Sequence, residues 1–309
     1  MYCKNCGHEV TEKSLYCENC KEILIPVEKF KEKVSKTDQG INLKHSLLLI
    51  GLYIVAFYVI GQALTIPIAI IFMILGIETT HEALMLAISN FLIYLTLAGA
   101  LIPFSIKFFK HDIIKFGQNL KKNLLIIFIG CIAIIVSTYI VNIIITIILL
   151  IGNKVGIIGD KYVDPNATSE NQQLIISMMT NSFSSAILTI IPTVIMAPIL
   201  EEIVFRKALF GLSNKLPILR VFIVSIIFAS IHVTSGILTN SLNVLIGADT
   251  IDSVLVEMIY FFSYFSGALI LSFAYYLSDY NILVTIAIHF FNNLISTLQI
   301  YLLFAAGNI

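Results

Sequence analysis

The sequence predicts an all-α membrane protein, a polytopic helical bundle of about seven spans with a small zinc-ribbon module at its N-terminus. Of its 309 residues, 58% are hydrophobic and only 12% are charged, whereas soluble globular proteins carry about 25% charged residues. Seven apolar runs reach the roughly 18 residues that a transmembrane helix needs. Two Cys-x-x-Cys pairs precede the first run. The formal net charge is +0, so the overall charge gives no reason to expect a nucleic-acid partner.

The two cysteine pairs predict a zinc ribbon over residues 1–24. Cys3-x-x-Cys6 and Cys17-x-x-Cys20 each direct two thiolates at one tetrahedral ion. A segment this short cannot bury a core, so zinc would supply its folding free energy. Two disulfides or unpaired thiols are the alternatives. We expect this segment to recruit a cytosolic protein or the substrate, or else only to cover the N-terminus, and its balanced charge disfavours nucleic acid.

Residues 25–45 are predicted to be a charged cytoplasmic linker, rich in lysine next to the membrane. Residues 46–179 then contain the first three spans and their loops, at 46–75, 83–108 and 123–151. Residues 160–173 are expected to form a polar loop with a turn at Asp164-Pro165-Asn166.

Residues 180–309 contain four further spans, expected at 182–210, 218–233, 254–277 and 282–305. The stretch 237–252 is too short and too polar to cross the membrane. We therefore expect it to lie in the interface or to dip back into the bilayer.

The basic loops set the expected orientation. They lie on one side if the N-terminus is cytoplasmic, and the opposite loops are mainly acidic. The basic loops are the linker, the loop after the second span, and the loop after the fourth span with Arg206, Lys207, Lys215 and Arg220. The C-terminus then lies outside, and the reducing cytoplasm favours zinc over disulfides.

The fourth span carries Glu201, Glu202 and Arg206 inside an apolar sequence. An ionised side chain at the bilayer centre costs about 2.5–3.5 kcal/mol on insertion scales, so these charges need partners or a wet cavity. Glu202 and Arg206 are one helical turn apart in the favourable order, which predicts an ion pair. Glu201 points about 100° away around the helix, which predicts that it faces another span.

Two histidines are the candidates to face Glu201. At about 1.5 Å per residue, Glu201, His232 and His289 lie roughly 14, 18 and 12 Å from the cytoplasmic ends of their spans. Asn293 shares a helix face with His289 because the two are four residues apart. Interhelical hydrogen bonds, worth about 0.6 kcal/mol each, are the structural alternative. So many polar groups at one depth exceed what packing needs, which indicates a catalytic site.

Three segments on successive helices carry these residues: Glu201-Glu202-x-x-x-Arg206, Phe228-x-x-x-His232 and His289-x-x-x-Asn293. Together they resemble the signature of the CPBP family, membrane proteases named for CAAX processing and bacteriocin processing. The resemblance covers about residues 182–305 and implies peptide-bond hydrolysis within the membrane, with residues 180–309 as the catalytic membrane core.

The resemblance also implies a role for each motif residue. Glu201, with His232, would activate a water molecule. His289 and Asn293 would stabilise the oxyanion. Glu202 and Arg206 would hold the helix and tune the site. The chemistry agrees, because a carboxylate suits a general base and an imidazole with an amide suits an oxyanion.

The sequence leaves the metal question open at this site. Glu201, His232 and His289 could hold a zinc ion, since two histidines and a glutamate are a known catalytic ligand set. Glu201 could equally activate water without a metal, and the sequence lacks the His-Glu-x-x-His motif. Ser230 and Cys131 are poorly placed to act as nucleophiles, and Cys131 is expected to be a packing residue.

The expected partners are the lipid bilayer and a peptide or protein substrate at the membrane. A non-proteolytic immunity or scaffold protein that keeps the pocket is the alternative. A transporter is disfavoured because the charged motif occurs once, without a counterpart in the first three spans. Prenylated CAAX peptides, leader peptides and peptide pheromones are the substrate precedents that the resemblance offers.

Overall fold

The computed structural model describes residues 3, 5–9, 17, 19–20, 41–74, 82–163, 168–213 and 215–307. It divides into two compact units, Met1–Gln39 and Gly40–Ile309. The first unit contains the four cysteines of the two Cys-x-x-Cys pairs, and the second contains every helix given below. Most of the predicted linker and the predicted turn at 164–166 lie outside the described residues.

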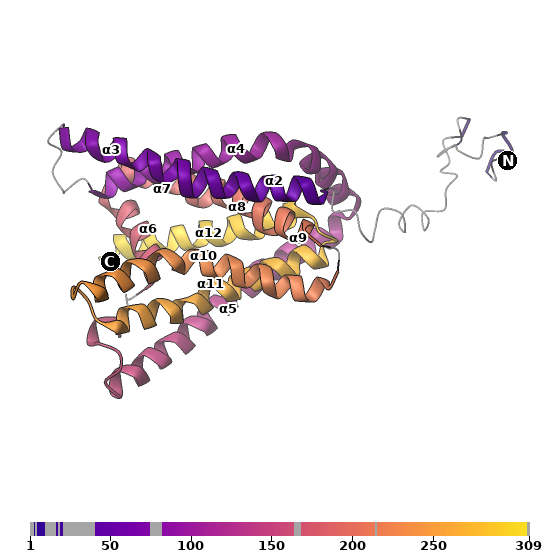
Figure 1. Cartoon of the computed structure of the whole chain (residues 1–309). Helices are drawn as coiled ribbons and strands as arrows, with labels where there is room; N and C mark the ends of the chain where they lie inside the picture. Colours follow the sequence, from indigo (N-terminus) through magenta and orange to yellow (C-terminus); the bar gives the residue numbers. More distant parts are fainter. Residues whose placement is uncertain are drawn as a thin grey trace. The chain divides into compact units, whose positions relative to one another are not determined.

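Within the described ranges, seven helical stretches are long and apolar enough to cross a membrane, as the sequence predicted (Figure 1). Two of them combine α-helical and π-helical (η) segments. The seven are α2–η1–α3 (Leu43–Ile54, Val55–Gly61, Gln62–Ile74), α4 (Glu82–Gln118), α5 (Leu120–Lys154), α7–η4–α8–η5–α9 (Phe183–Ile190, Ile191–Met196, Ala197–Glu202, Ile203–Ala208, Leu209–Gly211), α10 (Pro217–Leu245), α11 (Ile251–Leu277) and α12 (Ile282–Ala305). A 3-10 turn, η3 (Asp160–Tyr162), and the short helix α6 (Glu170–Asn181) connect α5 to α7.

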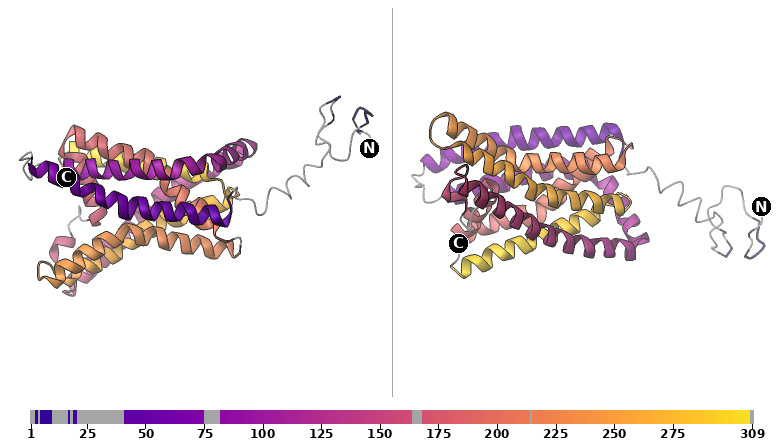
Figure 2. Two further views of the ribbon diagram at one scale, coloured as in Figure 1. Left: turned by 45° about the horizontal axis from the view of Figure 1, so that its top comes forward. Right: turned by 90° about the horizontal axis from the view of Figure 1, so that it is seen from below.

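The spanning helices pack on both sides of a central pair. The helix that contains α8 and the C-terminal helix α12 contact each other. On one side α4 packs against α8, with α2 and α3 beside α4. On the other side α10 and α11 form a close pair, and α5 covers α11 and α12 (Figures 1 and 2). Of the seven described spans, the one that contains α8 is the most buried.

Two stretches that were predicted to lie outside the spans are largely or partly helical in the structure. Residues 237–252 do not form a separate segment that dips back into the bilayer, because α10 continues to Leu245 and α11 begins at Ile251. Asn240 is buried and donates a hydrogen bond to the carbonyl of Ser253 at 3.4 Å, so a polar residue serves helix pairing there. The predicted loop 160–173 was wrong from Glu170 onward, where α6 begins with Ser169 as its N-cap.

The helix ends also differ from the predicted spans. The first helix begins at Leu43, inside the predicted linker, because the Asn42 side chain accepts the N–H of His45 at 2.9 Å and caps it. The second span continues to Gln118, ten residues beyond its predicted end at 108.

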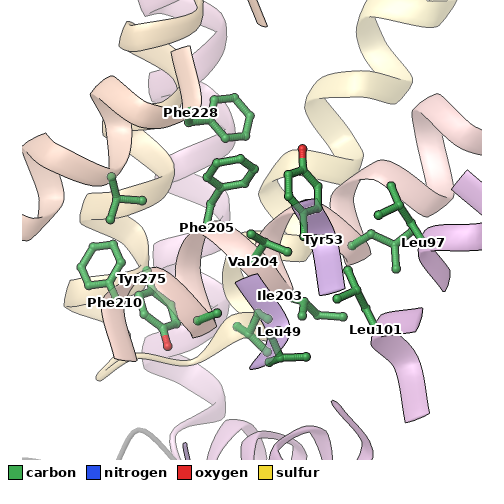
Figure 3. Close-up of a cluster of buried hydrophobic side chains, with 14 of the residues drawn as sticks. Leu49, Tyr53, Leu97, Leu101, Ile203, Val204, Phe205, Phe210, Phe228 and Tyr275 are labelled. Carbon is green, nitrogen blue, oxygen red and sulfur yellow. The ribbon is translucent and has the colours of Figure 1, made fainter. Parts of the chain in front are cut away.

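A core of buried apolar side chains joins the helices around α8 and η5. Figure 3 shows it, with Tyr53 from the first span, Leu97 and Leu101 from α4, and Phe205 and Phe228 at the centre. The rings of Phe205 and Phe228 pack edge to face with centroids 4.9 Å apart. The core fixes how α4, α8 and α10 lie relative to one another, and these helices carry the polar residues described next.

Candidate active site

Glu201 and Glu202 lie in α8, between two π-helical segments. In these segments the backbone hydrogen bond spans five residues: Ala197 N–H donates to the Pro192 carbonyl, and Leu209 N–H donates to the Val204 carbonyl. Each wide turn holds one residue more than an α-helical turn. Such turns inside α-helices are frequent at functional sites.

The predicted ion pair between Glu202 and Arg206 is present and fully buried, with Arg206 Nε 3.3 Å from Glu202 Oε2. The guanidinium also lies over the ring of Phe228, 5.0 Å from its centroid. The other carboxylate oxygen, Glu202 Oε1, lies 3.0 Å from Nδ1 of His289. Glu202 therefore links the arginine of its own helix to the histidine of α12.

Glu201 faces two histidines from two other helices. Its Oε2 atom lies 4.0 Å from Nε2 of His232 on α10 and 4.0 Å from Nε2 of His289 on α12. The Glu201 side chain is 12% exposed and the histidines are 20% and 8% exposed, so the three groups lie largely inside the bundle. The structure thus brings together Glu201, Glu202, Arg206, His232 and His289.

The partners of the histidines assign their tautomers. Nδ1 of His232 lies 2.8 Å from the carbonyl of Phe228, which can only accept, so Nδ1 carries the proton. Nδ1 of His289 faces the Glu202 carboxylate, which also accepts because it is paired with Arg206. In both neutral rings Nε2 is therefore a hydrogen-bond acceptor.

Asn293 is placed differently from the other motif residues. Its side-chain amide donates to the Thr193 carbonyl at 2.8 Å. That carbonyl has lost its helical donor, because Ala197 bonds to Pro192 and the next residue, Pro198, has no N–H. Asn293 thus completes the backbone of η4. Within the described ranges, no hydrogen bond or ion pair joins Asn293 to Glu201 or to either histidine.

Two tyrosines contact the site, and the sequence reasoning missed both. Tyr94 of α4 donates a hydrogen bond to Glu201 Oε1 at 3.1 Å. Tyr264 of α11 stacks on the ring of His232, with centroids 4.9 Å apart and planes inclined by 29°. Its hydroxyl contacts two residues at the start of α6, Ser169 at 2.8 Å and Asn171 at 3.1 Å. In the sequence both tyrosines stand out only by their position in the middle of a predicted span. Tyrosines that merely pack in the core occupy the same kind of position, so this position does not identify a site residue.

The donor atoms of Glu201, His232 and His289 are of the types that bind catalytic zinc, a carboxylate oxygen and two imidazole nitrogens. The donor atoms of these three residues lie farther apart than the sulfur atoms of the four N-terminal cysteines. Among the described residues, the four cysteines form the only group of three or more potential ligands that all lie within 4.8 Å of one another.

The four cysteines of the N-terminal unit could bind a metal ion. The Sγ atoms of Cys3 and Cys20 are 3.6 Å apart, as are those of Cys6 and Cys17. Tetrahedral zinc with bonds of about 2.3 Å would place its sulfur ligands roughly 3.8 Å apart. Gly7, with φ at 69°, forms the turn after the first pair and donates its N–H to the Cys3 carbonyl. A backbone hydrogen bond at His8 lowers the pKa of Cys6 to about 6, which favours the thiolate.

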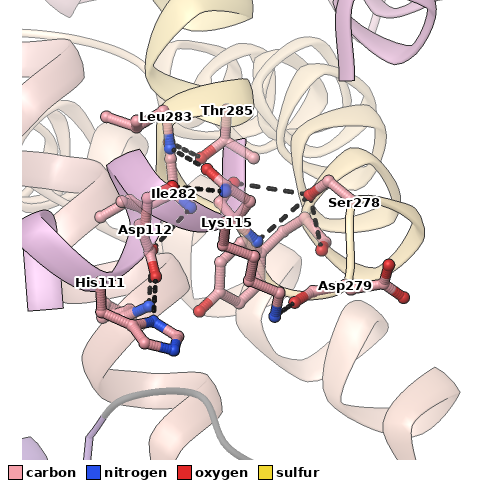
Figure 4. A network of polar contacts seen from close by, with 11 residues as sticks. His111, Asp112, Lys115, Ser278, Asp279, Ile282, Leu283 and Thr285 are labelled. Carbon is pink, nitrogen blue, oxygen red and sulfur yellow. Dashed lines mark hydrogen bonds and ion pairs between the residues drawn. The ribbon is translucent and has the colours of Figure 1, made fainter. Parts of the chain in front are cut away.

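A second buried charge cluster lies at the start of α12 (Figure 4). Lys207 is fully buried in η5, so its predicted place in a basic loop was wrong, and its Nζ lies 2.6 Å from Asp112 Oδ2. The same oxygen accepts the N–H of Ile282 at 3.1 Å. Nδ1 of His111 lies 3.0 Å from the other carboxylate oxygen, and Asn281 donates to the Asp112 carbonyl at 2.9 Å. We call this set the Asp112 cluster.

Arg206 and Arg220, predicted for the same basic loop, are also buried. Both lie within the predicted spans 182–210 and 218–233, and the structure places them in η5 and α10. Arg220 lies in α10 and donates to the carbonyl of Phe210 at 2.6 Å, which closes the turn between the fourth and fifth spans.

Part of the chain matches a known protein family. Residues 183–295 match the sequence model of the family described as type II CAAX prenyl endopeptidase Rce1-like. No curated protein and no solved structure gave a match. The matched stretch runs from the start of α7 into α12 and holds Glu201, Glu202, Arg206, His232, His289 and Asn293, whereas Tyr94 and α6 lie outside it. Over residues 183–295 the chain is therefore similar to the Rce1-like family of type II CAAX prenyl endopeptidases, in agreement with the CPBP resemblance.

Proposed function

We propose that this protein is an intramembrane endopeptidase that hydrolyses a peptide bond of a membrane-associated or hydrophobic peptide. The observation that carries the proposal is the position of Glu201, whose Oε2 lies 4.0 Å from Nε2 of both His232 and His289. These distances are too long for direct hydrogen bonds and suit groups that share one small ligand such as water. The family description adds prenylated CAAX peptides as one substrate class to test.

In the proposed reaction Glu201 is the general base. A water molecule between Glu201 and His232 gives one proton to the carboxylate, and its oxygen attacks the carbonyl carbon of the substrate. His232 accepts a hydrogen bond from the same water through Nε2. When the tetrahedral intermediate collapses, the C–N bond breaks and the leaving amine takes the proton from Glu201. The products are a carboxylic acid and an amine.

The proposed oxyanion donors are His289 and Asn293. His289 can donate from Nε2 only when the ring carries a second proton, and Glu202, 3.0 Å from Nδ1, supports the cationic ring. Asn293 has two amide hydrogens, of which one is donated to Thr193. We assign the other to the oxyanion. Glu202 and Arg206 hold α8 in place, which fixes the direction of Glu201.

The decisive test compares the wild-type protein with Glu201→Gln in proteoliposomes, using internally quenched peptides with and without a C-terminal prenyl group. Loss of the general base lowers the rate by at least about 100-fold. Glu257→Gln is the matched control, because Glu257 is a buried glutamate of α11 that accepts the Glu170 N–H, and a glutamine oxygen can still accept it. Equal rates for wild type and Glu201→Gln would refute the proposal and favour a binding or scaffold role.

Zinc at the membrane site is a second proposal with its own test. Glu201, His232 and His289 would hold the ion, which would polarise the substrate carbonyl and supply an activated water. The test measures zinc in the purified protein, in Cys17→Ser/Cys20→Ser and in His232→Ala/His289→Ala. Two zinc ions, one of them lost only with the histidine variant, would support a metalloprotease. One zinc ion lost only with the cysteine variant would leave Glu201 and water as the mechanism.

We infer that the N-terminal ribbon binds structural zinc in the cytoplasm and recruits a cytosolic protein or the substrate. The support is the spacing of its four thiols. A reporter enzyme that is active only on the non-cytoplasmic side of the membrane, fused at the C-terminus, tests the orientation. The fusion should show activity if the C-terminus lies outside. No zinc in any variant would refute the ribbon, and a cytoplasmic reporter would refute the topology.

A further inference from the structure

We propose that Tyr94 is a positioning residue for Glu201, supplied by α4 from outside the family-matched stretch, and that it gives the two carboxylate oxygens separate tasks. Oε1 is held by the tyrosine and Oε2 is left to face the substrate water. This inference rests on the proposed function and names a residue that the family motifs do not contain.

The geometry separates the two oxygens of Glu201. The Tyr94 hydroxyl donates to Oε1 at 3.1 Å, and Oε2 lies 4.0 Å from the Nε2 atoms of His232 and His289. The last torsion of a glutamate is broad and roughly two-fold, so the helix alone does not fix which way the carboxylate plane lies. A hydrogen bond to one oxygen does fix it. Tyr94 therefore determines where the lone pairs of Oε2 point.

The neighbours of Glu201 explain why the donor has to come from another helix. A carboxylate inside an apolar bundle needs hydrogen-bond donors to replace water. Arg206 is paired with Glu202 instead. Nε2 of His232 and Nε2 of His289 each lie 4.0 Å from Glu201 Oε2, too far for a direct hydrogen bond. Among the described residues, the Tyr94 hydroxyl makes the one hydrogen bond that Glu201 accepts through its side chain.

Apolar packing sets the position of Tyr94. Its neighbour Ile93 is buried against the first span at Gly61, where an added Cβ would lie 3.0 Å from the Ile93 side chain and 3.0 Å from the Ala56 carbonyl. One and two turns further along α4, Leu97 and Leu101 enter the core that also holds residues of α8 and η5. The glycine thus allows the close approach that brings the tyrosine to Glu201.

The first test is Tyr94→Phe in the full-length protein in proteoliposomes, which removes the hydroxyl and keeps the ring. We expect kcat to fall by about 10- to 100-fold, the range for one hydrogen bond to a charged group, with KM unchanged within about twofold. The control is Tyr276→Phe, since Tyr276 packs on the ring of Tyr280 beside the same core and should keep wild-type kcat. An unchanged kcat, or a raised KM alone, would overturn the proposal.

A second readout does not depend on activity. The infrared carboxylate bands of Glu201 are assigned from the difference between wild type and Glu201→Gln. Tyr94→Phe should shift these bands and Tyr276→Phe should not. Unshifted bands would overturn the proposal. If the wild type cleaves none of the probe peptides, the proposed function fails, and the infrared result alone decides whether Tyr94 holds Glu201.

A third variant tests the packing argument without touching the tyrosine. Gly61→Ala should move α4 away from the first span and lower kcat by about tenfold, because a displaced hydroxyl loses its hydrogen bond. Gly51→Ala is the matched control, since an added Cβ there meets nothing within 4 Å. Equal kcat values for the two alanine variants would contradict this account of how Tyr94 is placed.

Discussion

Two adjacent residues of η5, Arg206 and Lys207, enter two buried charge clusters that differ in how fully their polar atoms are paired. In the Asp112 cluster both carboxylate oxygens have partners. One accepts from both Lys207 and the backbone of Ile282, and the other contacts His111, which Figure 4 shows beside Asp112. Around Arg206 the pairing is incomplete. Both oxygens of Glu202 have charged or polar neighbours, Arg206 and His289. Within the described part of the chain, however, the Arg206–Glu202 contact is an ion pair without a hydrogen bond, and Nη1 of Arg206 makes no hydrogen bond.

The difference separates a structural cluster from a reactive one. A fully paired buried network holds one arrangement, whereas polar groups with spare bonding capacity can respond to a substrate. The Asp112 cluster also serves the site indirectly. Its carboxylate accepts the first N–H of α12, a favourable place for a negative charge, and His289 lies two turns further along that helix.

Breaking the Asp112 cluster should have the largest effect on stability. Lys207→Met leaves the Asp112 carboxylate buried without its cation, which should lower the free energy of unfolding by about 3–5 kcal/mol. Denaturant unfolding of wild type and variant in detergent measures this loss in the free energy of unfolding. The double variant Lys207→Met/Asp112→Leu should recover part of the loss. A loss below about 1 kcal/mol would show that the cluster is not the structural anchor described here.

Substitutions in the cluster around Arg206 should lower the free energy of unfolding less than Lys207→Met does. Its two glutamates, Glu201 and Glu202, should also differ in their effects. Glu202→Gln removes the charge next to Arg206 but keeps an oxygen that can accept, so we expect a loss of about 1.5–3 kcal/mol. Glu201→Gln should change stability by no more than about 0.5 kcal/mol. Thermal unfolding of both variants gives the comparison. Equal losses would mean that Glu201 is as structural as Glu202.

Asn293→Ala should cost about 1–3 kcal/mol, because the Thr193 carbonyl is left without a donor inside the membrane. Asn142→Ala is the control. Asn142 accepts an ordinary interhelical hydrogen bond from Ser263 at 2.8 Å, and such bonds are worth about 0.6 kcal/mol. Unfolding in detergent compares the two. Similar losses would contradict the special role of Asn293 in completing η4.

An exposed ion pair should have the smallest effect. The hydrogen bond from Lys161 lowers the pKa of Asp249 below its usual value. The pair therefore stabilises the protein above about pH 4, and this contribution is lost as the pH falls through the lowered pKa. Asp249→Asn should cost at most about 0.5 kcal/mol at pH 7. The difference from wild type should vanish near pH 2, and a difference that persists there would have another cause.

The sequence predicted the seven spans and the residues that meet at α8, because hydrophobic length and helical spacing are local properties. Glu201 and Glu202 differ by about 100° around one helix, so their different partners could be foreseen. His232 and His289 could be matched to Glu201 by depth alone. The contact with Tyr94 could not be foreseen, because it depends on which face α4 turns toward α8.

The other missed elements also depend on tertiary contacts. The segment Glu170–Asn181 is polar enough to resemble a loop, and it is helical where its first N–H is accepted by Glu257 of α11 at 2.6 Å. The extension of α10 depends on the contact between Asn240 and Ser253. Lys207 was predicted in a loop because its partner Asp112 lies about a hundred residues earlier in the chain.

The π-helical turns on both sides of Glu201 and Glu202 affect how the sequence of this helix aligns with the sequences of related proteins. A turn that closes over five residues instead of four accommodates one more residue without rotating the helix beyond it. The segments Ile191–Met196 and Ile203–Ala208 therefore act as two absorbed insertions. A protein with the same site on a plain α-helix would align with this chain only through a one-residue gap on each side of the glutamate pair.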